Sequence, residues 1–90
     1  MTTKTKILKI NDYFRTPEFP LAVCLLHFGF SIEAFDRDPK TPSKLTFVFK
    51  RSEELEKLVE KFWKKELRIE PTSFYNISRE LKSRMRADEF

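Results

Sequence analysis

The side chains best suited to chemistry lie near the C-terminal end of the chain, where basic residues and one aromatic ring recur at helical spacing. This group consists of Tyr75, Arg79, Lys82 and Arg86, with Arg84 beside it. Positions i, i+4, i+7 and i+11 share one face of a helix. A row of bases with a ring at one end is typical of a surface that binds phosphates and stacks an unpaired base. The alternative is a solvated helix face, whose charge Glu80 and Asp88 balance.

Further basic residues could extend this surface. They are Lys4, Lys6, Lys9, Lys50 and Arg51. The three N-terminal lysines belong to residues 1–12, which we interpret as a basic arm or an edge strand. The chain carries 18 Lys and Arg against 14 Asp and Glu, a net charge of +4. Basic domains tend to associate with polyanions, so DNA or RNA is one expected partner.

Catalytic and metal-binding residues are few. Cys24 and His27 are the only cysteine and histidine, and they lie in one apolar run, whereas metal sites need clusters of such ligands. A single glycine excludes a glycine-rich phosphate loop. Asp36 and Asp38 alternate in a predicted hairpin, and we interpret them as a solvated acidic turn. We therefore predict a protein that is not an enzyme and holds no cofactor or metal.

Three helices are predicted around these side chains. Pro71 opens the last one, whose inward face carries Phe74, Ile77, Leu81 and Met85, and residues 87–90 are expected to fray. Ser52 caps the preceding helix, and an apolar stripe follows it at helical spacing. That stripe consists of Leu55, Leu58, Val59, Phe62 and Trp63.

The first helix is expected to begin with Pro17 as its cap, so that Pro20 falls in the first turn, where its missing N–H costs nothing. Its sequence "LAVCLLHF" is apolar nearly all round and predicts a buried helix. Gly29 stands where a left-handed C-terminal cap belongs, and Phe30 can fold back on the last turn.

Alternation of apolar residues predicts a β-hairpin. Its strands are "FSIEAFDRD" and "KLTFVFK", joined by the loop "DPKTPS" at residues 38–43. Leu45, Phe47 and Phe49 share one face of the second strand and are expected to be core, while Thr46, Val48 and Lys50 point the other way. Extended segments are also predicted at residues 6–10 and 12–15, and a short strand at Leu67–Ile69 is left open.

Residues 13–86 are therefore expected to form a single α+β domain in the order β-α-β-β-α-(β)-α. A small antiparallel sheet of about three strands packs against the three helices. Ninety residues are enough for one modest core. The longest apolar run is too short to cross a membrane and the N-terminus lacks a signal-peptide core, so a cytoplasmic location is expected.

The element order weakly resembles that of the RNA-recognition motif. Its RNA-reading strand has the signature K/R-G-F/Y-G/A-F-V-x-F/Y. Aligning Phe47 and Val48 with its "F-V" places Leu45 and Lys50 at aromatic positions. Two of three stacking positions are then missing, which favours core roles for Phe47 and Phe49.

A second resemblance covers roughly residues 13–86. The run "TPEF", the pattern "L-A-x-x-L-L-x-x-G-F", "FVF" before "SEELEKLV", the pair "FW", the run "IEPTSF" and the later "LK" resemble a family of small prokaryotic and phage proteins. That family is known only as a domain of unknown function. Glu70 and Pro20 depart from its pattern. The matching residues are nearly all core or cap residues, so the resemblance implies a fold and no activity.

Two functions from different classes stay open. The first is a small nucleic-acid-associated accessory protein of a mobile element or its prokaryotic host. The second is a protein-binding adaptor, or a small subunit of a larger complex, that docks through a helix face or a free strand edge such as residues 6–15.

Overall fold

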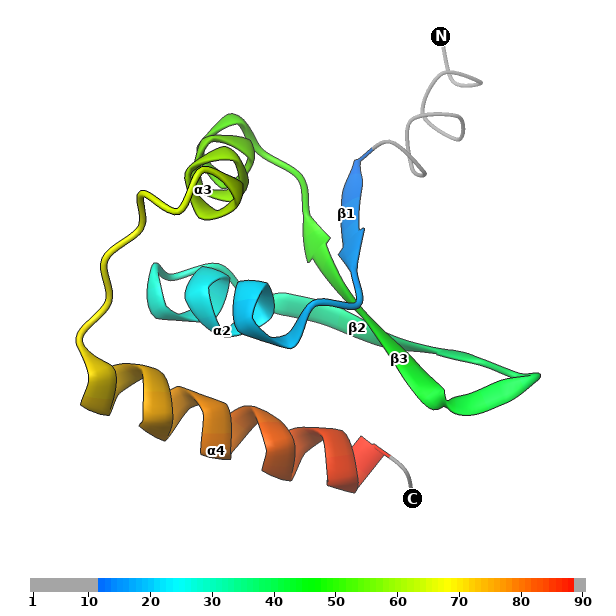
Figure 1. The fold of residues 1–90 in the computed structure, drawn as a ribbon. Coiled ribbons are helices and arrows are strands. Elements are labelled where there is room, and N and C mark those ends of the chain that lie inside the picture. Colours follow the sequence, from blue (N-terminus) through cyan, green and yellow to red (C-terminus); the bar gives the residue numbers. More distant parts are fainter. Residues whose placement is uncertain (1–11, 89–90) are drawn as a thin grey trace, which may run out of the picture.

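The computed structural model describes residues 12–88, which form a three-stranded antiparallel sheet and three helices (Figure 1). The strands are β1 (Tyr13–Thr16), β2 (Ile32–Asp38) and β3 (Thr41–Lys50). The helices are α2 (Phe19–His27), α3 (Glu53–Trp63) and α4 (Pro71–Asp88). The predicted α+β class is confirmed. The predicted extended segment at 6–10 lies outside the described residues.

The strand β3 is the centre of the sheet, with β1 and β2 pairing antiparallel on its two sides. The predicted hairpin is present, but its connection is only Pro39 and Lys40, because β3 already begins at Thr41. The Asp38 carboxylate accepts the Lys40 N–H at 2.9 Å and tightens this turn. A register shift between Arg37 and Asp38 accommodates the residues that we had predicted to be loop.

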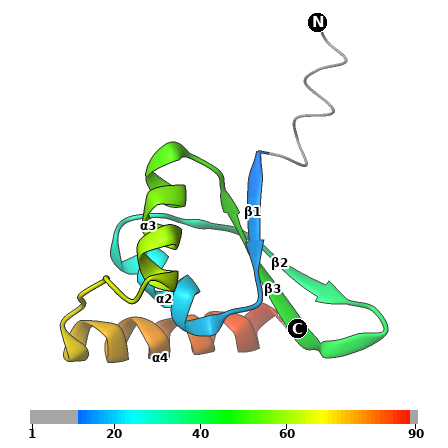
Figure 2. The same ribbon diagram turned by 45° about the horizontal axis from the view of Figure 1, so that its top comes forward.

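All three helices lie on one side of the sheet, and α2 runs between α3 and α4 (Figures 1 and 2). This position explains why five consecutive residues of α2, Leu21–Leu25, are buried. The predicted buried helix is therefore confirmed. No helix of residues 12–88 lies on the other face of the sheet.

The core forms where the helices meet β3. Phe47 and Phe49 are 1% and 0% exposed, so both are core residues, as predicted. Phe47 packs against the rings of Phe19 and Phe35, with centroids 6.4 and 6.0 Å away. Neither ring is free to stack on a base, as an RNA-recognition motif would require.

The two ends of α2 follow from local hydrogen bonds. The cap is Glu18, one residue later than predicted, because the Thr16 hydroxyl oxygen accepts the Glu18 N–H at 3.1 Å and shapes the preceding turn. At the other end Gly29 has φ +98° and donates to Leu26 O, while Phe30 donates to Leu25 O. This pair of bonds is the Schellman motif, and it confirms the predicted glycine cap.

The helices α3 and α4 begin with side-chain caps. The Ser52 hydroxyl oxygen accepts the Leu55 N–H, as predicted. The Glu70 carboxylate accepts the N–H groups of Thr72 and Ser73 at 3.1 and 2.9 Å. Glutamate thus serves as the cap of α4, in place of the shorter residues that usually do so. This helix continues through residues 87 and 88, for which we had predicted a frayed end.

Candidate nucleic-acid interface and an adjoining apolar groove

The C-terminal helix α4 has one buried face and one solvent-facing basic face. Leu81 is fully buried, and the half-buried apolar residues beside it pack on the core. They are Phe74, Ile77 and Met85. Tyr75 is 60% exposed, and Arg79, Lys82 and Arg86 are exposed as well. The predicted row of these four side chains on one face, which we call the basic stripe, therefore points into solvent.

Ring contacts order part of the basic stripe. The Arg79 guanidinium lies 5.8 Å from the centroid of the Tyr75 ring, and the Lys82 ammonium lies 5.6 Å from that of Phe19 in α2. Arg84 behaves differently, because its guanidinium lies over Phe35 of β2 at 5.6 Å. Lys82 and Arg84 thus contact rings of two different elements, α2 and β2. Arg84, predicted to flank the stripe, is held at the opposite edge of the apolar face.

Ion pairing separates the stripe from the other bases. Within residues 12–87, no carboxylate pairs with Arg79, Lys82 or Arg86. Bases elsewhere do form ion pairs, among them Arg15–Asp36, Arg51–Glu56 and Lys64–Glu60. The three bases of the stripe therefore keep their charge available for an anion from solution.

The remaining candidates lie elsewhere. Arg51 donates to Glu56 at 2.8 Å and to the Tyr13 carbonyl at 3.2 Å, so its guanidinium ties β1 to α3. Lys50 is exposed and is the last residue of β3. Figure 1 shows that β3 ends on the side of α3, whereas α4 lies beyond α2. These two residues do not adjoin the basic stripe. Lys4, Lys6 and Lys9 fall outside the described residues.

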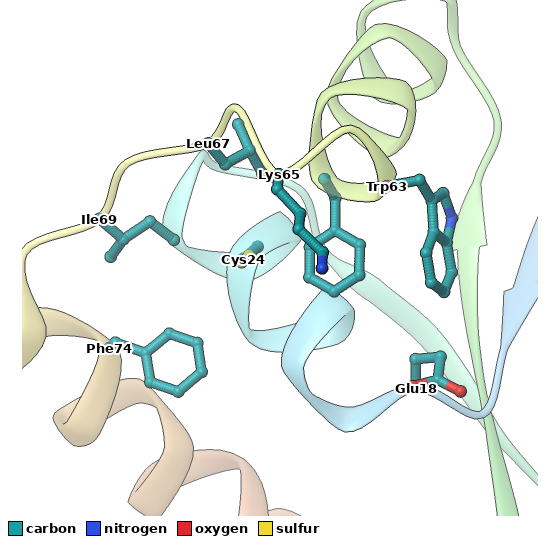
Figure 3. Close-up of a pocket in the computed structure, with 8 residues that line it drawn as sticks. Glu18, Cys24, Trp63, Lys65, Leu67, Ile69 and Phe74 are labelled. Carbon is teal, nitrogen blue, oxygen red and sulfur yellow. The ribbon is translucent and has the colours of Figure 1, made fainter.

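A groove of about 510 Å³ opens between α2, the end of α3 and the start of α4. Cys24 forms part of its floor, and side chains from α3, the 64–70 connection and α4 form its walls (Figure 3). Its lining residues are Glu18, Cys24, Phe62, Trp63, Lys65, Leu67, Ile69 and Phe74. Leu67–Ile69, left open as a short strand, is irregular and lies along this groove.

Sequence reasoning missed the exposure of Trp63. We placed it in the inward stripe of α3, but its side chain is 58% exposed. Eight residues after Leu55 it lies at the margin of the apolar face, about 80° away on a helical wheel, and α3 ends there. An edge contact with Phe62 at 5.0 Å between centroids holds the indole beside the groove. This position at the margin of the apolar face was the one signal in the sequence that Trp63 would be exposed.

The residue after the cap of α3 has an unusual backbone. Lys65 has φ +63°, and it is the only residue other than glycine with positive φ among residues 12–88. It donates to Phe62 O, and Glu66 donates to Lys61 O, which is the same bonding pattern that ends α2. The end of α3 therefore places lysine where the end of α2 places Gly29.

The only thiol in the sequence, that of Cys24, lines the groove. Burial raises the pKa of the Cys24 thiol, which keeps it protonated near neutral pH.

Among residues 12–88, no three His, Cys, Asp or Glu side chains gather closely enough to hold a metal ion. Across the same residues, no helix has the length and apolar character needed to span a bilayer.

Comparison with known families gives a match over most of the chain. The model of a family described as Domain of unknown function (DUF5659) matches residues 11–87, nearly the whole chain. Neither the search of curated proteins nor that of solved structures found a match. The predicted resemblance to a family of unknown function is thus confirmed.

Proposed function

The chain belongs to the DUF5659 family, and we propose that this member is a small, basic, non-enzymatic protein that binds nucleic acid through the basic stripe of α4. In this proposal it is a cytoplasmic accessory protein of a mobile element or its prokaryotic host. The observation that carries the proposal is the row of Arg79, Lys82 and Arg86, exposed and without carboxylate partners in residues 12–87.

The chemistry of this row suits phosphate. Each base that neutralises a phosphate releases condensed counterions, and this release makes binding tight at low salt and weak at high salt. The three bases lie within eight consecutive residues of a helix, and the first and last are about 11 Å apart along its axis. Contacts with phosphates carry no sequence information, so we expect binding that depends weakly on base sequence.

Tyr75 adds a second kind of contact. Its ring is 60% exposed and lies at the N-terminal end of the row, with the Arg79 guanidinium against it. Exposed rings beside cations are the means by which proteins hold unpaired bases without reading them. The stripe therefore favours a partner whose bases are accessible.

The test is a salt titration of labelled DNA and RNA oligonucleotides, followed by fluorescence anisotropy. The triple variant Arg79→Ala, Lys82→Ala, Arg86→Ala is compared with the wild type. The slope of log K against log salt should flatten by about 0.9 per lost duplex contact and about 0.7 per lost single-strand contact. The matched control Lys40→Ala, Lys57→Ala, Lys61→Ala removes the same charge from exposed positions on the hairpin and α3.

Two results would contradict the proposal. Equal weakening by the two triple variants would mean that net charge, not the stripe, drives association. No binding by the wild type at low salt would favour the second candidate, a protein-binding adaptor. One observation supports that candidate, because β1 lies at the edge of the sheet and an edge strand can accept another strand.

A further inference from the structure

We infer that the groove beside Trp63 holds one unstacked base of a single-stranded nucleic acid, with the indole stacking on the base and Lys65 meeting the adjoining phosphate. This inference rests on the proposed function, since it supplies a second contact for a strand that lies on the basic stripe. It names the substrate class as single-stranded, because paired bases in a duplex are already stacked and cannot enter a groove.

The size and walls of the groove fit a base. Its volume of about 510 Å³ lies within the range of small-molecule sites. Phe62, Trp63 and Phe74 give it aromatic walls, and Leu67 and Ile69 complete the apolar lining. Every base has an aromatic face, so stacking in such a groove needs no particular sequence.

The charge at the groove suits a ligand that carries an anionic group next to its aromatic ring. Lys65 lines the groove, and no carboxylate pairs with its ammonium within residues 12–88. A nucleotide is a ligand that joins an aromatic ring to a phosphate. Figure 3 shows the Lys65 side chain and the Trp63 indole approaching the groove together from the end of α3.

The backbone at Lys65 supports a role for its side chain. At φ +63° lysine is strained, whereas glycine at the equivalent position of α2 is not. Strained backbone conformations persist only where the surrounding structure holds them, and they are concentrated at binding and active sites. The same motif ends both helices, so the choice of lysine over glycine at the groove is not required by the fold.

Glu18 orients the bound nucleotide. Figure 3 shows Glu18 beyond the tip of the Trp63 indole, on the turn before α2. A carboxylate repels phosphate but accepts N–H groups from a base edge. The base edge is therefore directed toward Glu18, and the phosphate toward Lys65.

The groove and the basic stripe meet at the start of α4, where two successive residues belong to the two surfaces. Phe74 lines the groove, and Tyr75, the next residue, begins the stripe. The distance along the helix from Tyr75 to Arg86 is about 16 Å. A single strand of a few nucleotides can therefore place phosphates on the stripe and one base in the groove.

The experiment uses the single tryptophan as a reporter. Trp63 is the only tryptophan in the chain, so emission excited at wavelengths that tyrosine does not absorb comes from the proposed site. Stacking of a base on an indole quenches its emission. Titration with a twelve-nucleotide dT oligonucleotide should quench the fluorescence with the same midpoint as anisotropy, and a duplex of equal length should leave it unchanged.

Two variants test the two contacts. Trp63→Leu keeps an apolar side chain, and it should weaken single-strand binding measured by anisotropy about 5- to 150-fold. Lys65→Gly removes the cation and relieves the strain at this backbone position, so the variant should unfold at a higher denaturant concentration than the wild type. For single-strand binding, its slope of log K against log salt should flatten by about 0.7. Lys64→Ala, which removes the neighbouring charge without touching the groove, should leave quenching as it is.

The outcomes separate this inference from the proposed function. Binding by anisotropy that the stripe variant abolishes, with no change in Trp63 fluorescence, would overturn the inference and leave the proposed function standing. An unchanged salt slope for Lys65→Gly would remove Lys65 from the site. Absence of binding to any oligonucleotide would overturn both the inference and the proposed function. Quenching of Trp63 fluorescence by a peptide, with no quenching by any oligonucleotide, would also overturn both.

Discussion

Arg15 of β1 and Asp36 of β2 form an ion pair that crosses the central strand β3 on the face of the sheet opposite α2, α3 and α4. Arg15 and Ala34 stand opposite Val48 in the register, and Asp36 stands opposite Thr46. Val48 lies with this pair in one surface depression and is only 5% exposed. We had predicted that Val48 points away from the core face, and on that other face the side chains of the edge strands cover it.

The crossing ion pair should contribute little to stability. Both side chains are about half exposed, at 54% and 53%, so water screens their attraction. A double-mutant cycle with Arg15→Ala and Asp36→Ala should give a coupling of about 0.2–1 kcal/mol, measured by urea unfolding. The coupling should shrink in 1 M salt. A coupling of several kcal/mol that salt leaves unchanged would indicate a desolvated pair instead.

Phe47 should be one of the most sensitive positions in the chain. It is 1% exposed and contacts the rings of Phe19 and Phe35. Phe47→Ala should lower the free energy of unfolding by about 3–5 kcal/mol, because it removes a buried ring and leaves a cavity. Phe28→Ala is the matched control, since Phe28 is 43% exposed. Equal denaturation midpoints for the two variants would show that Phe47 is not buried.

Gly29→Ala tests the cap of α2 by conformation alone. A methyl group at Gly29 would meet no atom within 4 Å, so the substitution causes no clash. The φ of +98° still disfavours alanine, and the free energy of unfolding should fall by about 1–2 kcal/mol. Thermal unfolding by circular dichroism measures it. An unchanged melting temperature would mean that the cap relaxes without cost.

Acid should loosen the start of α4. Hydrogen bonds from the N–H groups of Thr72 and Ser73 lower the pKa of the Glu70 carboxyl below its usual range. A group with a lowered pKa in the folded state stabilises it above the unfolded pKa, about 4.3. This contribution is lost as the pH falls through the folded pKa.

The measurement is the denaturant midpoint between pH 7 and pH 2.5. The wild type should lose more stability over this window than Glu70→Gln, which carries no charge to protonate. Glu80→Gln, in the middle of the same helix, should follow the wild type. Parallel pH curves for all three proteins would refute a charged cap at Glu70.

Tyr75 should contribute to single-strand binding and not to folding. Because the ring is 60% exposed, Tyr75→Ala should change the free energy of unfolding by less than about 0.5 kcal/mol. Its affinity for single-stranded oligonucleotides should fall by about 1–3 kcal/mol. Tyr75→Phe keeps the ring and should bind like the wild type. A loss for both variants would assign the contact to the hydroxyl group.

Much of the fold could be predicted from residues close together in the chain. The Ser52 cap, the Gly29 cap and the core face of Phe47 and Phe49 each depend on hydrogen bonds or periodicity within a few residues. The basic stripe of α4 was predictable for the same reason, because helical spacing alone places its members on one face. Family membership followed from these core and cap residues.

Other features were decided only when distant segments met. Whether Trp63 faces the core or solvent depends on where α2 and the 64–70 connection lie against the end of α3. The divergence of Lys82 and Arg84 depends on Phe19 and Phe35, which come from other elements. The burial of Val48 needs both edge strands. Local sequence determined which residues share a face, whereas packing between segments far apart in the chain decided what covers each face and where the groove opens.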